Sequence, residues 1–156
     1  MKHGIFDWIK SIFRGPQEYL ILREYSIFSE LNSYDLFLLY ELVHTREFKP
    51  GEVIFESGYP LEVIYLIHSG EIELRGEHHA NTGKVLGQGE HLGILDLYYN
   101  GQRNSTATAK SKVTAHAISR TDLKGFIESR PHMGIKILGA INRDLCNLLH
   151  SDIKEI

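Results

Sequence analysis

The segment most able to do chemistry is a glycine-punctuated stretch between residues 89 and 107 that contains a single arginine. Glycines stand at positions 89 and 93, and Arg103 follows Gly93 by ten residues. Glycine lets the backbone approach a ligand closely, and the N–H groups at the start of a short helix carry partial positive charge. A guanidinium adds planar donors that suit phosphate oxygens. The spacing predicts a small-anion site, with an ordinary loop and a solvated arginine as the alternative.

This stretch resembles the phosphate-binding cassette of the cyclic-nucleotide-binding domain family. That family includes the catabolite activator type of bacterial regulator and the regulatory subunits of cAMP-dependent protein kinase. The matching residues are Leu92-Gly93-Ile94-Leu95-Asp96-Leu97 and Gln102-Arg103-Asn104-Ser105-Thr106. Upstream, the resemblance continues through Ile27-Phe28-Ser29-Glu30-Leu31, Phe48-Lys49-Pro50-Gly51-Glu52-Val53-Ile54, Gly58, Tyr65-Leu66-Ile67 and Ser69-Gly70-Glu71-Ile72. It therefore covers roughly residues 25–150.

The resemblance implies that Arg103 holds the phosphate of a cyclic nucleotide. The ligand-binding set that it implies is Gly93, Ile94, Leu95, Arg103, Asn104, Ser105 and Thr106. It assigns no catalytic residue and no metal ligand. It also implies that the long final helix forms a lid over the base or a dimer seam.

Ile94 departs from the family pattern, which has a glutamate at this position that accepts a hydrogen bond from the ribose 2′-hydroxyl. Isoleucine cannot accept that bond, and its loss costs about 1–3 kcal/mol, or roughly ten- to a hundredfold in affinity. We therefore expect weakened binding of cAMP or cGMP, a different small anionic ligand, or no ligand. With no ligand, the chain would be a degenerate domain used for protein interaction or oligomerisation.

The surrounding pattern predicts an α+β fold: a β-roll, or double-stranded jelly-roll-like barrel, with N-terminal helices and a long C-terminal helix. Short apolar runs between glycine turns predict strands at residues 52–55, 62–68, 71–75, 84–86 and, with a turn at the lysines, 106–118. Helices are expected at residues 17–25, from Asn32 or Ser33 to about His44, after a cap at Ser119, and from Pro131 onward.

The last predicted helix carries an apolar stripe of Met133, Ile137, Ile141, Leu145 and Leu148. The stripe predicts core packing, with a homodimer through this helix as the alternative. Residues 4–14 predict an amphipathic helix within an N-terminal extension of residues 1–24, followed by the domain proper at residues 25–156. We expect the extension to pack on the domain or on a second subunit, and contact with a membrane surface is the less favoured alternative.

The overall composition excludes several classes of protein. A net charge of −3 lacks the excess positive charge that nucleic-acid-binding proteins use. The short stretch after Pro131 also leaves no room for a helix-turn-helix, so direct DNA binding is not expected. Cys146 is the single cysteine, which excludes an intrachain disulfide and fits a reducing cytoplasm. No clustered zinc ligands, nucleophile elbow or P-loop occur. We therefore expect a cytoplasmic ligand-sensing regulatory domain and not an enzyme.

Overall fold

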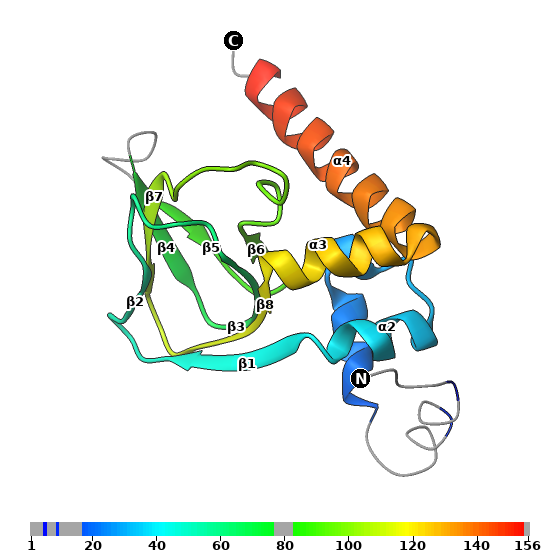
Figure 1. Ribbon diagram of the computed structural model, residues 1–156. Helices are drawn as coiled ribbons and strands as arrows, with labels where there is room; N and C mark the ends of the chain where they lie inside the picture. Colours follow the sequence, from blue (N-terminus) through cyan, green and yellow to red (C-terminus); the bar gives the residue numbers. More distant parts are fainter. Residues whose placement is uncertain (1–4, 6–8, 10–16, 77–82, 155–156) are drawn as a thin grey trace. The chain divides into compact units, whose positions relative to one another are not determined.

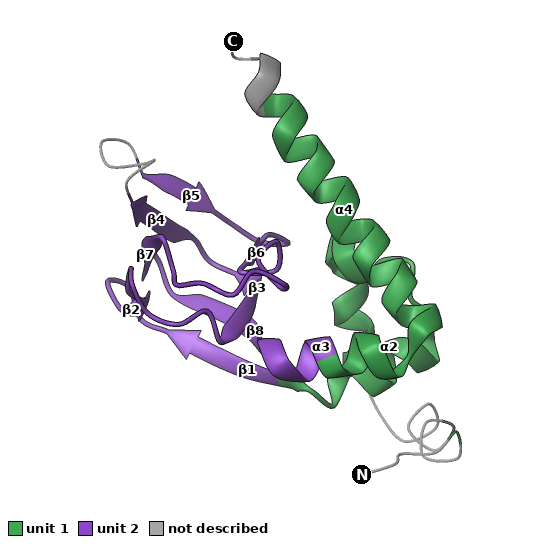
Figure 2. Cartoon of the chain, turned by 45° about the horizontal axis from the view of Figure 1, so that its top comes forward, with its two compact units in different colours: residues 1–43, 125–156 green, residues 44–124 purple. Residues whose placement is uncertain are grey.

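The computed structural model describes residues 17–76 and 83–154, together with Ile5 and Ile9. The chain divides into two compact units: unit 1 comprises Met1–Val43 and Gly125–Ile156, and unit 2 comprises His44–Lys124 (Figure 2). Each unit is described separately below. Within the described residues, no helix is long and apolar enough to cross a membrane.

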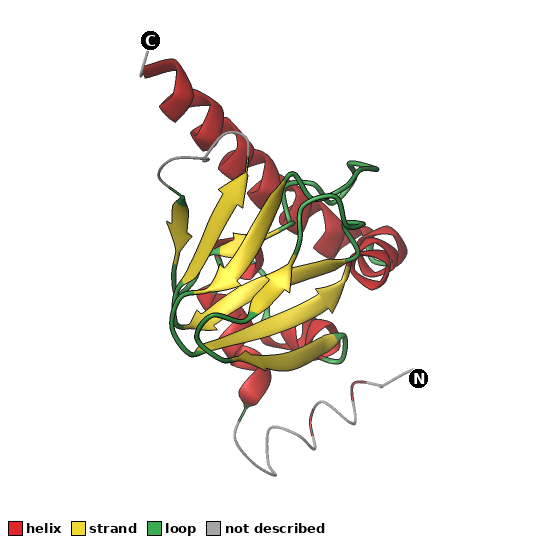
Figure 3. Cartoon of the chain, turned by 90° about the vertical axis from the view of Figure 1, so that its left-hand side faces the viewer, coloured by secondary structure: helices red, strands yellow, loops and turns green. Residues whose placement is uncertain are grey.

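Unit 2 is built from two four-stranded sheets, whose strands are yellow in Figure 3 and labelled in Figure 1. The order of strands in the first sheet is β1-β8-β3-β6, and in the second it is β2-β7-β4-β5. The pairs β3–β8, β3–β6, β2–β7, β4–β7 and β4–β5 are antiparallel. The strands are β1 (Val43–Phe48), β2 (Val53–Phe55), β3 (Val63–Ser69), β4 (Ile72–Gly76), β5 (Lys84–Leu86), β6 (His91–Leu92), β7 (Ser105–Ala109) and β8 (Val113–Ser119).

The core of unit 2 lies between these two sheets. Side chains alternate across a strand, so each sheet turns one set of apolar residues toward the other sheet. The buried cluster takes members from β3 to β8: Ile67, Ile72, Leu86, Leu92, Ala107, Ala109, Val113 and Ala115. Phe55 and Tyr65 pack against this cluster and are only partly buried, because they approach the open side of the roll where the pocket described below is found.

Unit 1 is helical. Its described residues include the 3₁₀ helices η1 (Glu18–Glu24) and η2 (Ser26–Phe28) and the α-helices α2 (Ser33–Tyr40) and α4 (Pro131–Lys154). Helix α3 (Arg120–Ser129) begins in unit 2 and ends in unit 1. The Asn32 side chain caps α2 by accepting a hydrogen bond from the backbone N–H of Asp35 at 2.9 Å. Helix α4 buries one face through Met133, Ile137, Ala140 and Ile141.

The predicted α+β roll with a long C-terminal helix is confirmed. The helix predicted to reach His44 is wrong at its end, since α2 stops at Tyr40 and Val43–Phe48 forms β1. This strand stands at the edge of its sheet and its four central residues are exposed, so it lacks the apolar alternation that marks a half-buried strand. The two-residue strand β6 was also not predicted. The helix predicted at residues 4–14 falls outside the described residues except at Ile5 and Ile9.

Candidate functional site

Arg103 is fixed by its backbone to the loop between β2 and β3. Its N–H donates to the carbonyl of Tyr59 at 2.8 Å, and its carbonyl accepts from the N–H of Gly58, also at 2.8 Å. Pro60 and Gln102 form a further bridge beside these bonds. Two segments that are more than forty residues apart in sequence are therefore joined as an extension of the β2–β7 pairing.

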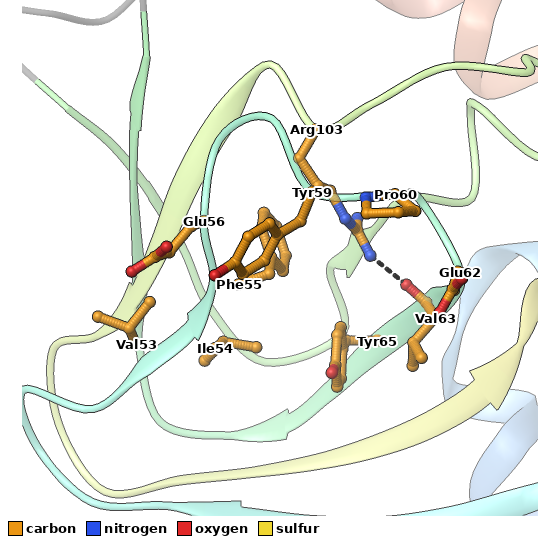
Figure 4. Close-up of a pocket in the computed structure, with 10 residues that line it drawn as sticks. All are labelled: Val53, Ile54, Phe55, Glu56, Tyr59, Pro60, Glu62, Val63, Tyr65 and Arg103. Atoms are coloured by element: carbon orange, nitrogen blue, oxygen red, sulfur yellow. Dashed lines mark hydrogen bonds between the residues drawn. The ribbon is translucent and has the colours of Figure 1, made fainter.

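The Arg103 side chain is buried, with 7% of its surface exposed. Its guanidinium carbon lies 3.9 Å from the centre of the Phe55 ring, and its Nη2 donates to the carbonyl oxygen of Val63 (Figure 4). Its Nε has no hydrogen-bond partner in the described part of the chain. Burial lowers the pKa of Arg103 from its ordinary value, while the charges of Tyr65 and Asp96 act in the opposite direction. Arginine nevertheless remains a cation in proteins. The site therefore holds a buried positive charge whose Nε–H has no acceptor among the described residues.

The backbone conformation and surroundings of Gly93 explain why a glycine is needed ten residues before Arg103. Its φ of +86° lies in the left-handed region, where residues with a Cβ are strained. A Cβ built on Gly93 would also stand 2.9 Å from Nη1 of Arg103. The spacing seen in the sequence therefore reflects a direct approach of the arginine side chain to the glycine backbone.

A pocket of about 300 Å³ opens beside Arg103. Its walls come from β2, from the start of β3 and from the loop that joins them, and Arg103 closes one side (Figure 4). Three aromatic rings, two carboxylates and several aliphatic side chains form the lining: Val53, Ile54, Phe55, Glu56, Tyr59, Pro60, Glu62, Val63, Tyr65 and Arg103. This is the mixture of apolar walls and a few polar groups that is typical of small-molecule sites.

The segment after Gly93 forms turns and not a short helix. The N–H of Leu97 donates to the carbonyl of Ile94 at 3.1 Å, and the N–H of Tyr99 donates to the carbonyl of Asp96 at 2.9 Å. The side chain of Ile94 is fully buried, Leu95 is half-buried and Asp96 is exposed. Ile94 thus serves as a core residue, which no glutamate could do without burying its charge.

Of the seven predicted ligand-binding residues, only Arg103 lines this pocket. Asn104 is exposed, and Ser105 and Thr106 begin strand β7. The hydroxyl of Thr106 accepts the N–H of Ser57 at 3.1 Å, so it helps to hold the loop between β2 and β3. The lining residues Glu56, Tyr59 and Glu62 were missed, because their segment has the composition of an ordinary turn.

The cassette is also tied to the start of α3. Nη1 of Arg120 donates to the carbonyl of Tyr99 at 2.5 Å, and Nη2 donates to Oδ1 of Asn100 at 3.3 Å. The ammonium of Lys124 lies 5.0 Å from the centre of the Tyr98 ring. Within residues 17–76 and 83–154, no three histidine, cysteine, aspartate or glutamate side chains gather as metal ligands.

Comparison with known proteins identifies relatives with similar sequences. The chain is 24% identical over 143 residues to a CRP-like cAMP-activated global transcriptional regulator of Mycobacterium tuberculosis, covering 85% of the chain and 64% of the regulator. It is 28% identical over 99 residues to a cAMP-dependent protein kinase regulatory subunit of Yarrowia lipolytica, covering 64% of the chain and 26% of the subunit. The match thus spans less than two thirds of either relative.

Among solved structures, the catabolite activator protein of Thermus thermophilus superposes with a TM-score of 0.67 at 25% identity. That match covers 83% of this chain and 63% of the other. The family model described as the cyclic nucleotide-binding domain matches residues 45–130, which is more than half of the chain and includes the pocket and Arg103. The chain therefore belongs to the cyclic nucleotide-binding domain family.

Proposed function

We propose that this chain is a regulatory ligand-sensing domain that binds a small anionic, nucleotide-like molecule through Arg103. The observation that carries the proposal is the state of that side chain, a buried guanidinium at the wall of a pocket with Nε unpaired among the described residues. A buried cation without a counterion is costly, and an anionic ligand would supply the missing partner. Membership in a family with cAMP-activated members is consistent with this ligand class.

The ligand that best fits the proposal is a cyclic nucleotide or a molecule of similar charge. Arg103 would pair with its phosphate, and the backbone around Gly93, Leu95, Asn104 and Ser105 would share that contact. Because Ile94 is fully buried and apolar, it offers no acceptor for a ribose hydroxyl. Affinity for cAMP or cGMP through the usual contacts is therefore expected to be reduced.

The proposed output passes from the cassette into the C-terminal helices. Arg120 is the first residue of α3 and is bonded to Tyr99 and Asn100, and α3 runs on through Arg130 into α4. A ligand that shifts the cassette turns would pull on the start of α3. This role is regulatory and not catalytic, and we propose that it is carried out in the cytoplasm by the domain of residues 25–156.

Calorimetric titration of the full chain with a panel of cyclic mono- and dinucleotides tests the proposal. We expect heat with at least one of them and loss of that heat in Arg103→Ala. Because Arg103 is buried, circular dichroism of the variant must first show a folded protein. The absence of heat with every compound, or binding that ignores Arg103→Ala, would contradict ligand sensing at this site.

A second candidate function is that of an oligomerisation module, and exposed apolar residues on α4 favour it. Ile135, Leu138 and Leu149 are exposed by 73%, 37% and 60%, and with half-buried Leu145 they recur at coiled-coil a and d spacing. Asn142 occupies the a position between them, where a polar residue specifies register. Sedimentation of the full chain should then show a dimer that Leu138→Glu dissociates, regardless of nucleotide. A monomer at all concentrations would refute this function.

A further inference from the structure

The pocket contains a second polar feature that the anion site does not explain. Its lining has one guanidinium, from Arg103, and two carboxylates, from Glu56 and Glu62. Both glutamates are exposed, so water screens their charges and their carboxylates act chiefly as hydrogen-bond acceptors at the edge of the pocket. Carboxylates are good acceptors for hydroxyl and amine groups. The lining therefore suits an anion whose other end donates hydrogen bonds.

The two carboxylates are in different situations. Glu56 already accepts a hydrogen bond from Tyr59, and this bond raises the pKa of the tyrosine. Glu62 forms no hydrogen bond or ion pair through its side chain with any residue that the structure describes. Glu62 is therefore the carboxylate with its acceptor capacity free for a ligand.

The backbone holds Glu62 at the end of the pocket toward which the arginine points. Figure 4 shows Glu62 next to Val63, whose carbonyl oxygen accepts the Nη2 hydrogen bond of Arg103. The N–H of Glu62 donates to the carbonyl of Pro60 at 3.1 Å, and its carbonyl accepts from the N–H of Arg120 at 2.8 Å. These bonds fix the residue from both sides, so its carboxylate leaves the backbone at a defined point of the pocket mouth.

We propose that Glu62 is a specificity-determining residue that accepts hydrogen bonds from a hydroxyl or amine of an anion held by Arg103. It supplies from the β2–β3 loop the acceptor that Ile94 does not provide in the cassette. This inference rests on the proposed function, and it restricts the ligand class to anions with donor groups. Inorganic phosphate is then expected to bind more weakly than such a ligand.

The test uses the full chain, with cAMP and inorganic phosphate as probes, and compares Glu62→Ala with Glu71→Ala. Glu71 is an exposed glutamate at the turn before β4 and does not line the pocket, so its variant has the same net charge. We expect Glu62→Ala to weaken cAMP binding about tenfold or more, because a charge-assisted bond is lost. Phosphate binding, followed by amide shifts at Gly93 and Arg103, should stay equal or become tighter. Glu71→Ala should change neither affinity.

A further probe, 2′-deoxy-cAMP, distinguishes the two kinds of donor. If the ribose hydroxyl is the donor, Glu62→Ala should hardly weaken the deoxy compound further, whereas an amine donor leaves the tenfold loss intact. Equal losses in Glu62→Ala and Glu71→Ala, or an equal loss of phosphate affinity, would overturn the inference while Arg103→Ala still abolished binding. Where another nucleotide of the panel binds more tightly than cAMP, the same comparison is made with that nucleotide. If the wild-type protein bound no nucleotide of the panel and no phosphate, the proposed function and this inference would both be wrong.

Discussion

Replacing Gly93 with alanine tests whether the cassette glycine exists for its backbone conformation alone or also for the arginine beside it. Gly93 has a φ of +86°, and Gly89, only four residues away, has a φ of +84°. A Cβ on Gly93 would stand 2.9 Å from Nη1 of Arg103, whereas a Cβ on Gly89 would have no neighbour within 4 Å. The two positions therefore share the backbone strain and differ in the contact with the guanidinium.

The expected magnitudes follow from this difference. The left-handed conformation costs a residue with a Cβ about 1–2 kcal/mol, so Gly89→Ala should lower the free energy of unfolding by that amount. In Gly93→Ala the guanidinium must move, but it is confined by the Phe55 ring and by its hydrogen bond to Val63. Losing that bond while the group stays buried adds about 1–3 kcal/mol. The total for Gly93→Ala is then about 2–5 kcal/mol.

Urea denaturation of the single variants and of Gly93→Ala in an Arg103→Ala background measures these terms. Once the arginine side chain is absent, the cost of Gly93→Ala should fall to that of Gly89→Ala, which is the signature of a direct coupling. Equal costs for Gly93→Ala and Gly89→Ala in the wild-type background would refute the reasoning. So would a cost of Gly93→Ala that is the same with and without Arg103.

Three other outcomes are expected. Ile94→Glu places a carboxylate at a fully buried position, so it should lower the free energy of unfolding by on the order of 3 kcal/mol in urea titrations; a negligible cost would show that the site is open to water. The hydrogen bond from Arg75 lowers the pKa of Glu73, so this carboxylate stabilises the fold above its unfolded pKa, and the contribution is lost as pH falls through the folded value. As the pH falls below about 4.3, Glu73→Gln should accordingly lose less stability than the wild-type protein. Thermal melts at stepped pH follow this loss, and parallel curves of melting temperature against pH would disprove a stabilising Arg75–Glu73 pair. Arg120→Ala should speed amide exchange in residues 98–100 about fivefold by mass spectrometry, since the bond to the Tyr99 carbonyl is lost; unchanged exchange would count against this clamp.

Much of the fold follows from local patterns that a sequence displays directly. Alternating apolar residues bounded by glycine turns located β2, β3, β4, β5, β7 and β8 to within a few residues. Ser119 caps α3 by accepting the N–H of Asp122 at 3.4 Å, and Pro131 begins α4, both as predicted. These signals work because capping, turn formation and face alternation depend on residues only a few positions apart.

Other features arise only from contacts between distant segments. The edge strand β1 has no local apolar pattern, and its pairing with β8 becomes visible only when the sheet forms. Ile94 looked like a lost ligand contact in the sequence, but the structure places it in the core with no exposed surface. Its burial depends on the direction in which the backbone of the turn points the Ile94 side chain. The spacing of residues in the sequence does not reveal that direction.

The proposed anion site shows the same division. Gly93 and Arg103 could be identified from the sequence as candidate site residues. A left-handed turn favours glycine, and the planar donors that suit phosphate oxygens come from arginine. What the guanidinium faces was decided by tertiary structure, since backbone hydrogen bonds bring the β2–β3 loop against Arg103 from more than forty residues away. That pairing places Phe55, Tyr59 and Glu62 around the pocket. The residues that would select a ligand thus come from a loop that resembles any other turn until the two segments meet.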